Sequence, residues 1–287
     1  MSNLKRLSPD GRNWTTSVPE APARISFGNR RNLPILWCHL SILTARNTRN
    51  SHAENGNSMA LRWAYSSLKW PLEDLERNLS LLVEHGWEGW ETRESLDWLG
   101  TPKCLKQMCE RIGIEIAAVS GPNVPMSRED QAFTVNKRRI EYASDLGVRL
   151  LMTKGPGSKD HPTDHEELSR IAGLYNELAR HGEPLGVTVC FHPHINHFVD
   201  SKEEWVRFMP MLDTCRLCMD MSHAVRWGYD PVEATTAYAD RIALVHLHDE
   251  KDGEGADIGK GPMCDYPAFL SAIRETGYDD WVVACPG

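Results

Sequence analysis

Leu217-Cys-Met-Asp220-Met-Ser-His223, with Leu244-Val-His246-Leu-His248-Asp249 downstream, is the part of the sequence that decides the fold. In both stretches a short apolar run ends in a cluster of Asp and His. A third run, Val187-Thr-Val-Cys-Phe191, ends in the same way at His192-Pro-His194. Short apolar runs are typical of buried strands, so metal-binding side chains stand at one end of three consecutive strands. A (β/α)₈ barrel builds its active site at the carboxyl ends of its strands.

Eight apolar runs between residues 60 and 285 are expected to form strands. They are 61–66, 89–92, 114–120, 149–154, 187–192, 216–221, 242–248 and 281–284. Helical spacing of leucines separates them, for example at Leu72, Leu75, Leu79 and Leu82. Strands that alternate with helices form right-handed βαβ units and a parallel sheet. Eight such units in about 225 residues predict an α/β protein with a (β/α)₈ TIM barrel fold.

Composition divides the chain into an N-terminal extension, residues 1–58, and the barrel, residues 59–287. The extension contains eight Lys or Arg against three Asp or Glu, whereas the whole chain has a formal net charge of −8. We expect the extension to be poorly ordered, and we expect the barrel to lack its last helix. An organelle transit peptide is an alternative for the extension. As a further alternative, the extension could lie over the gap left by the missing helix, since its residues 33–43 are apolar.

Charge and cysteine content limit the classes of function. A net charge of −8 and a pI near 5.8 argue against a nucleic-acid partner, because phosphate binding needs a concentrated basic face. Residues 33–43 are too short to span a membrane. Eight cysteines without a hydrophobic leader indicate reduced thiols in a cytoplasmic protein. Cys215 and Cys218 have CxxC spacing but no second pair at zinc-ribbon distance, so we interpret them as structural. A small molecule is the expected partner, and the sequence leaves open whether the protein forms a homo-oligomer.

The stretch from Met59 to Ala284 resembles the xylose-isomerase-like TIM barrels, a family that includes sugar phosphate isomerases and epimerases, ketose 3-epimerases and inosose dehydratases. Four segments carry the resemblance: Gly86-Trp-Glu-Gly-Trp-Glu91, Asp220-Met-Ser-His223, Tyr238 to Asp249, and Asp265 to Trp281. The resemblance covers nearly four fifths of the chain. It implies the barrel fold and one divalent ion at the carboxyl ends of strands five to eight.

The family's metal ligands are a Glu, an Asp, a His and a Glu, and the resemblance assigns these positions to His192, Asp220, His246 and Cys285. Only the middle two match in residue type. Imidazole at His192 adds no negative charge, which favours Mn²⁺, Co²⁺ or Zn²⁺ over Mg²⁺. A Cys285 thiolate can bind a soft metal, but a cysteine near a chain end is more often incidental.

The chemistry that the resemblance implies is proton abstraction beside a carbonyl. A divalent ion that chelates a hydroxyketone stabilises the enediolate, and loss of a β-hydroxyl from it gives a dehydratase. Because both family carboxylates are replaced, His194 and His223 are the candidate bases, with pKa values expected near neutrality. His223 could instead orient the Asp220 carboxylate.

Glu91, Lys154 and His248 are the candidate substrate contacts. Each also fits an ordinary structural role: Glu91 as a solvated loop residue, Lys154 before a Gly-Pro turn, and His248 as an outward-facing residue. The sequence therefore predicts a metal-dependent isomerase, epimerase or dehydratase acting on a sugar, keto-sugar or cyclitol. One alternative is a barrel that has lost its metal and binds a ligand. Another is a zinc-dependent endonuclease of DNA repair, which the acidic net charge disfavours.

Overall fold

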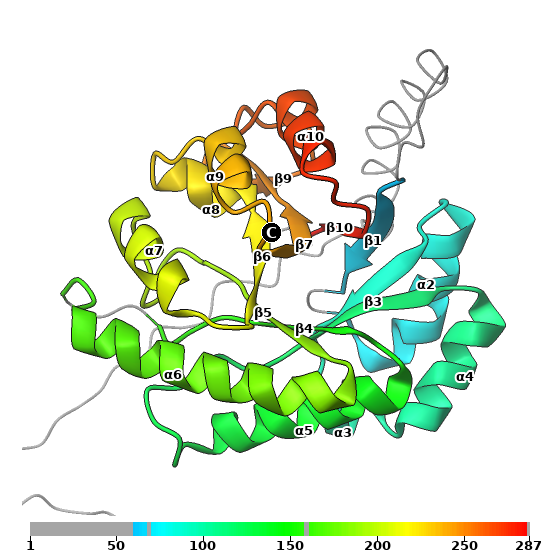
Figure 1. Ribbon diagram of the computed structural model, residues 1–287. Coiled ribbons are helices and arrows are strands. Elements are labelled where there is room, and N and C mark those ends of the chain that lie inside the picture. The colour runs from blue at the N-terminus through cyan, green and yellow to red at the C-terminus, as the bar shows by residue number, and fades with distance from the viewer. Residues whose placement is uncertain (1–59, 68–69, 158–160, 286–287) are drawn as a thin grey trace, which may run out of the picture. The chain divides into compact units, whose positions relative to one another are not determined.

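A closed barrel of eight parallel strands is the centre of the computed structural model, which describes residues 60–67, 70–157 and 161–285 (Figure 1). The strands follow chain order around the barrel, and the first pairs with the last. The expected fold and all eight expected strands are therefore confirmed, whereas the expected disorder of residues 1–58 concerns a segment outside the described residues. The barrel strands are β1 (Arg62–Ser66), β2 (Gly89–Thr92), β3 (Glu115–Ser120), β4 (Leu150–Thr153), β5 (Thr188–Phe191), β6 (Arg216–Asp220), β7 (Ile242–Leu247) and β10 (Trp281–Ala284).

Helices connect the strands and cover the outside of the barrel, as α5 and α6 show in Figure 1. Local sequence sets their ends. Asp164 begins α6 in a capping box with Glu167, and Gly113 and Gly147 end α4 and α5 in the left-handed conformation. The helices are α2 (Leu75–Glu84), α3 (Leu96–Leu99), α4 (Pro102–Ile112), α5 (Gln131–Leu146), α6 (His165–Gly182), α7 (Lys202–Phe208), α8 (Met221–Arg226), α9 (Pro231–Ala237) and α10 (Tyr266–Glu275), with 3₁₀ turns at Leu72–Asp74, Glu183–Leu185 and Met209–Met211.

Alternating residues of each strand divide the core into two layers. On β6, Leu217 and Met219 pack into the larger cluster with the helices, whereas Cys218 packs inside the barrel. Asp220 stands two residues beyond Cys218, so the same alternation turns it into the barrel at the carboxyl end. The apolar interior therefore ends in a layer of polar side chains. The inner cluster contains Ala64, Ala117, Ala118, Leu150, Met152, Cys190, Cys218, Leu244, Trp281 and Val283.

A small hairpin, β8 (Asp249–Lys251) and β9 (Glu254–Ala256), follows β7. The buried Asp249 carboxylate accepts backbone N–H groups from Glu250 at 2.8 Å and from Gly259 and Gly261 at 2.9 Å. A Cβ on Gly261 would lie 2.2 Å from the Glu250 carbonyl oxygen, so this close approach requires glycine. These contacts fix the loop that follows strand β7.

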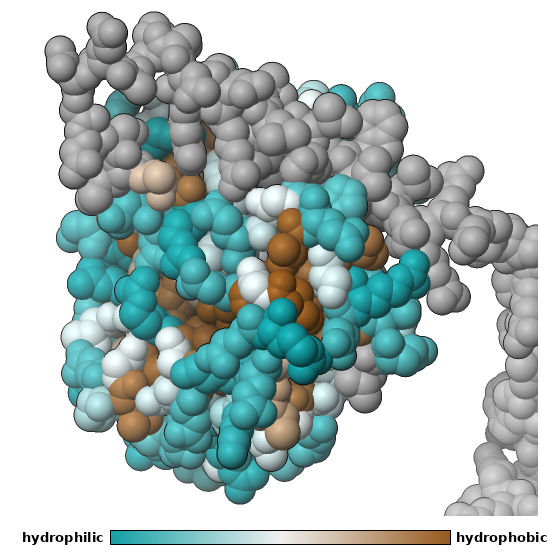
Figure 2. Space-filling model, turned by 90° about the vertical axis from the view of Figure 1, so that its right-hand side faces the viewer, coloured by the Kyte–Doolittle hydropathy of each residue, from teal (hydrophilic) through white to brown (hydrophobic). Residues whose placement is uncertain are grey.

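Among the described residues seen in Figure 2, hydrophilic side chains predominate, and apolar ones gather near the centre of the view. Within the described ranges, the large hydrophobic side chains that are exposed are Leu185 and Val206. None of the helices described is both long enough and apolar enough to cross a membrane. The seven cysteines in the described part of the chain are all free thiols.

Candidate metal centre

His192, Asp220 and His246 meet inside the barrel at the carboxyl ends of β5, β6 and β7. All three are at most 2% exposed. His192 Nε2 lies 3.2 Å from Asp220 Oδ2, and the centroids of the His192 and His246 rings are 4.9 Å apart. The structure thus brings together three of the four side chains for which the sequence predicts metal binding, and the fourth, Cys285, interacts with His246.

The Asp220 carboxylate is held in place by its own helix and by two imidazoles. Its Oδ1 accepts the Ser222 backbone N–H at 2.9 Å and the Ser222 hydroxyl at 2.6 Å, because Asp220 is the N-cap of α8. Its Oδ2 lies 3.5 Å from His223 Nε2 in addition to the His192 contact. Burial alone would raise the pKa of Asp220, but His223 and His192 hold it well below its ordinary value. The group is therefore a carboxylate at neutral pH.

Two triads of donor atoms fit a divalent metal, namely His192, Asp220 and His223, and His192, Cys218 and His246. Within each triad the donor atoms lie within 4.8 Å of one another. Neighbouring ligands of a tetrahedral zinc ion are about 3.4 Å apart, close to the 3.2 and 3.5 Å at Asp220. The Nδ1 atoms of His192 and His246 are buried, and neither has a hydrogen-bonding partner among the described residues. Such orphaned atoms are rare unless a ligand satisfies them.

Glu91 forms a second polar group at the carboxyl end of β2. Its Oε2 lies 2.7 Å from His246 Nε2, and its Oε1 accepts hydrogen bonds from Ser66 Oγ and Arg93 Nε, both at 3.0 Å. Burial by itself raises the pKa of Glu91, but His246 and Arg93 reverse this and leave it below its ordinary value. The pKa of His246 is raised despite its burial, by its interactions with Cys218 and Glu91. The protein itself therefore pairs His246 with a buried carboxylate.

Cys285 follows β10, and neither donor triad includes it. Its thiol accepts a hydrogen bond from Arg93 Nη2 at 3.1 Å. The Cys285 carbonyl accepts the Nδ1–H of His248 at 2.9 Å. Metal ligation by Cys285 and substrate contact by His248 stay predictions.

Lys154 directly follows β4 and is half-buried. Burial lowers its pKa, and the positive charge of Arg93 adds to this effect. The side chain therefore belongs to the same polar region as Arg93. Its contact with substrate stays a prediction, as does that of Glu91.

The two candidate bases, His194 and His223, lie beside each other with ring centroids 4.2 Å apart. The Ile195 carbonyl lies 2.7 Å from His194 Nδ1; because a carbonyl only accepts, Nδ1 carries the hydrogen and Nε2 presents a lone pair. Burial lowers the pKa of His194 to about 3 and that of His223 to about 4. Both rings therefore stay neutral at neutral pH, and the expectation from the sequence that their pKa values lie near neutrality is wrong.

Sequence reasoning missed Arg93, and it interpreted Cys218 as structural, which stays a prediction. Both stand two residues from a singled-out carboxylate, Arg93 after Glu91 and Cys218 before Asp220. Residues at this spacing on a strand share one face. This alternation was the signal that could have placed both side chains toward the same interior.

Comparisons with known proteins agree with this geometry. The family model described as "Xylose isomerase-like TIM barrel" matches residues 79–286. The inosose dehydratase of Geobacillus kaustophilus is 30% identical over 218 residues, which are 63% of this chain and 70% of that protein.

Solved structures of other proteins share the barrel. A structure of L-ribulose 3-epimerase superposes with a TM-score of 0.67 at 20% identity, covering 78% of this chain and 80% of that one. A structure of the IOLI protein with a zinc atom gives 0.64 at 21% identity, covering 78% and 88%. At these identities the structural likeness shows the fold alone, whereas the match to the family model shows family membership. This chain belongs to the xylose isomerase-like TIM barrel family.

Proposed function

We propose that this protein is a metal-dependent isomerase, epimerase or dehydratase that acts on a sugar, keto-sugar or cyclitol. The observation that carries the proposal is the convergence of His192, Asp220 and His246 inside the carboxyl end of a closed barrel. Relatives named inosose dehydratase and L-ribulose 3-epimerase support the substrate class. The common chemistry is removal of a proton from a carbon beside a carbonyl group.

His192, Asp220 and His223 would hold the metal, and His246 belongs to the second donor triad, with His192 and Cys218. A divalent ion bound there supplies the positive charge that makes a C–H bond beside a carbonyl acidic. Imidazole donors favour Zn²⁺, Co²⁺ or Mn²⁺ over Mg²⁺. Asp220 is already ionised, so it contributes negative charge to the site without a change of protonation.

His194 is the residue that we assign to proton abstraction. Its Nδ1–H is engaged by the Ile195 carbonyl, which fixes the tautomer with a lone pair on Nε2. A pKa lowered to about 3 keeps this nitrogen free of a proton at neutral pH, at some loss of basicity. His223 lies against the His194 ring with its Nε2 directed at Asp220, so it is placed to hold His194 and the carboxylate in register.

The ion pair between Glu91 and His246 favours a second candidate function. A protonated His246 cannot bind a metal until it loses a proton, and Glu91 opposes that loss. A barrel that keeps this pair and binds a sugar-like ligand without a metal is therefore the alternative. Metal binding decides between the two.

Deuterium exchange tests the proposal directly. Chelated protein is reloaded with Zn²⁺, Co²⁺ or Mn²⁺ and incubated with keto-sugars and inososes in heavy water. We expect metal-dependent incorporation of deuterium beside the carbonyl, measured by NMR. His194→Gln should abolish the exchange while metal stoichiometry is retained, and the control His181→Gln, on the outer helix α6, should leave both unchanged. Stoichiometric metal without exchange on any of these substrates would contradict the proposal, whereas a protein that takes up no metal but still binds one of these sugars would support the ligand-binding alternative.

A further inference from the structure

His192 and His246 share an arrangement that the family's ligand set does not explain. Each ring directs Nε2 to a carboxylate, His192 to Asp220 at 3.2 Å and His246 to Glu91 at 2.7 Å. Each ring also has a buried Nδ1 that no hydrogen-bonding group of the described residues satisfies. Metal-binding histidines have this pattern, since one nitrogen binds the ion and the other donates to a carboxylate.

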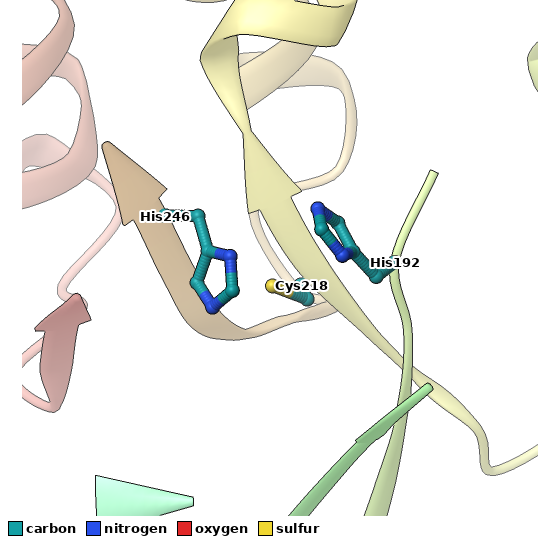
Figure 3. A group of neighbouring side chains, drawn as sticks. All are labelled: His192, Cys218 and His246. Atoms are coloured by element: carbon teal, nitrogen blue, oxygen red, sulfur yellow. The ribbon is translucent and has the colours of Figure 1, made fainter. Parts of the chain in front are cut away.

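The Cys218 sulfur lies between these two rings (Figure 3). Strand register explains why. Cys190 pairs with Arg216 between β5 and β6, and continuing that register two residues places His192 level with Cys218. Asp220 pairs with His246 between β6 and β7, which brings the third ring in from the other side. The three donor atoms lie within 4.8 Å of one another.

We propose that His192 Nδ1, Cys218 Sγ and His246 Nδ1 form a thiolate–imidazole metal site, set one residue layer deeper in the barrel than the Asp220 carboxylate. Zn²⁺ and Co²⁺ are the ions that one thiolate and two imidazoles select. Asp220 and Glu91 would act as the hydrogen-bond acceptors that orient the two rings. This inference rests on the proposed function, because it says which donor triad holds the metal.

Charge supports the thiolate. The two carboxylates beside the proposed site, Asp220 and Glu91, contact the Nε2 atoms of the rings, so the three donor atoms themselves bring no negative charge to a divalent cation unless Cys218 ionises. Binding breaks the S–H bond of Cys218 and the Nδ1–H bond of His246, releases both protons to solvent and leaves a thiolate and a neutral imidazole on the metal. That thiolate supplies one negative charge. Both triads use His192, so we expect them to compete for one ion.

Cobalt spectroscopy of the full-length protein tests the inference. Chelated protein is titrated with Co²⁺ without oxygen, and the near-ultraviolet thiolate-to-cobalt charge-transfer band is recorded. We expect one equivalent of Co²⁺ and the band in the parent protein and in Cys285→Ser. In Cys218→Ser we expect the band to be lost and Zn²⁺ affinity to fall by at least about tenfold. X-ray absorption of the zinc-loaded parent protein should show one sulfur neighbour of the metal. This measurement does not depend on whether Cys218→Ser folds.

The possible failures separate this inference from the proposed function. Bound Co²⁺ without a sulfur band, or a zinc spectrum without sulfur, overturns the thiolate site and leaves the Asp220 triad and the proposed function standing. A band that disappears in Cys285→Ser and persists in Cys218→Ser would show that the thiolate ligand is Cys285, after β10, and not Cys218 on β6. This result also overturns the inference. A sulfur band in a protein that shows no deuterium exchange confirms the site and contradicts the proposed function.

Discussion

The two sides of the barrel mouth are built from the same strand ends but have opposite polar chemistry. Around β5, β6 and β7, the imidazoles of His192 and His223 surround one carboxylate and keep donor atoms available. Around β1, β2 and β10, the Arg93 guanidinium binds Glu91, Ser66 and the Cys285 sulfur. On the first side, the contacts of the Asp220 carboxylate with basic side chains of the described residues are with imidazoles. On the second side, the Arg93 guanidinium is a fixed positive charge beside Glu91. His246 stands between them, paired with Glu91 and near His192.

This difference shows that position on the barrel does not by itself make a metal ligand. Glu91 is as buried as Asp220 and also ends a strand, yet Arg93 and His246 already neutralise it. A carboxylate with a fixed cation contributes less to a second one, because the attraction is already satisfied. The following predictions test how separate the two sides are.

The largest effect is expected from removing two donors on the metal side. Asp220→Ala with His246→Ala should lower metal affinity by more than about 100-fold, since changes even beyond the direct ligands typically cost about 10–100-fold. Stoichiometry is measured by elemental analysis after dialysis. Asp213→Ala with His181→Ala, both on outer surfaces, is the control and should keep the metal. Undiminished metal in the first double variant would contradict the site.

Glu91→Gln tests the ion-paired side. The amide keeps the shape of the side chain but leaves Arg93 and His246 without a buried counter-charge, so we expect a loss of about 3–5 kcal/mol in unfolding free energy. Urea unfolding of metal-free protein measures it. Glu115→Gln removes the exposed partner of Arg62 and should cost less than about 1 kcal/mol. Similar values for the two variants would show that the buried pair contributes no more than a surface pair.

Acid should weaken the metal-free protein through its neutral imidazoles. His192, His194 and His223 have lowered pKa values in the folded state, so below about pH 6.5 the unfolded chain binds protons that the native state does not. Stability is then lost as the pH falls from about 6.5 toward 4, by about 1.4 kcal/mol per pH unit for each ring that stays neutral. His246, with its raised pKa, is charged in both states over this window and does not offset the loss.

The slope of unfolding free energy against pH between 7 and 5 measures this effect. His223→Asn removes one of the titrating rings and should reduce the slope by the share of one imidazole. An unchanged slope would mean that His223 is protonated in the native state, contrary to the direction of its pKa.

The smallest effect is expected from placing a carboxylate at position 285. In Cys285→Glu the new side chain meets Arg93, which already donates to Cys285 Sγ, so the carboxylate should pair with the guanidinium rather than with the metal. We expect metal affinity, measured by competition with a chelator, to change by less than about tenfold. A gain beyond about 100-fold would show that the β10 edge belongs to the metal side after all.

Periodicity and strand-end composition were enough to predict the eight strands, the closed barrel and the convergence of His192, Asp220 and His246. These features depend on local spacing, because a strand end and an inward face follow from alternation along a few residues. The resemblance carried by Asp220-Met-Ser-His223 and the segment around His246 added the family.

Only the tertiary structure decided which further side chains join these three. The stagger between β5 and β6 places His192 level with Cys218, which no spacing along the chain reveals. Arg93 donates hydrogen bonds both to Glu91 and to the Cys285 sulfur, although Arg93 and Cys285 are 192 positions apart in the sequence. The pKa directions of His194, His223 and His246 follow from burial and from neighbours on other strands. Electrostatic environment depends on distance in space, and the sequence specifies that distance only through the completed barrel.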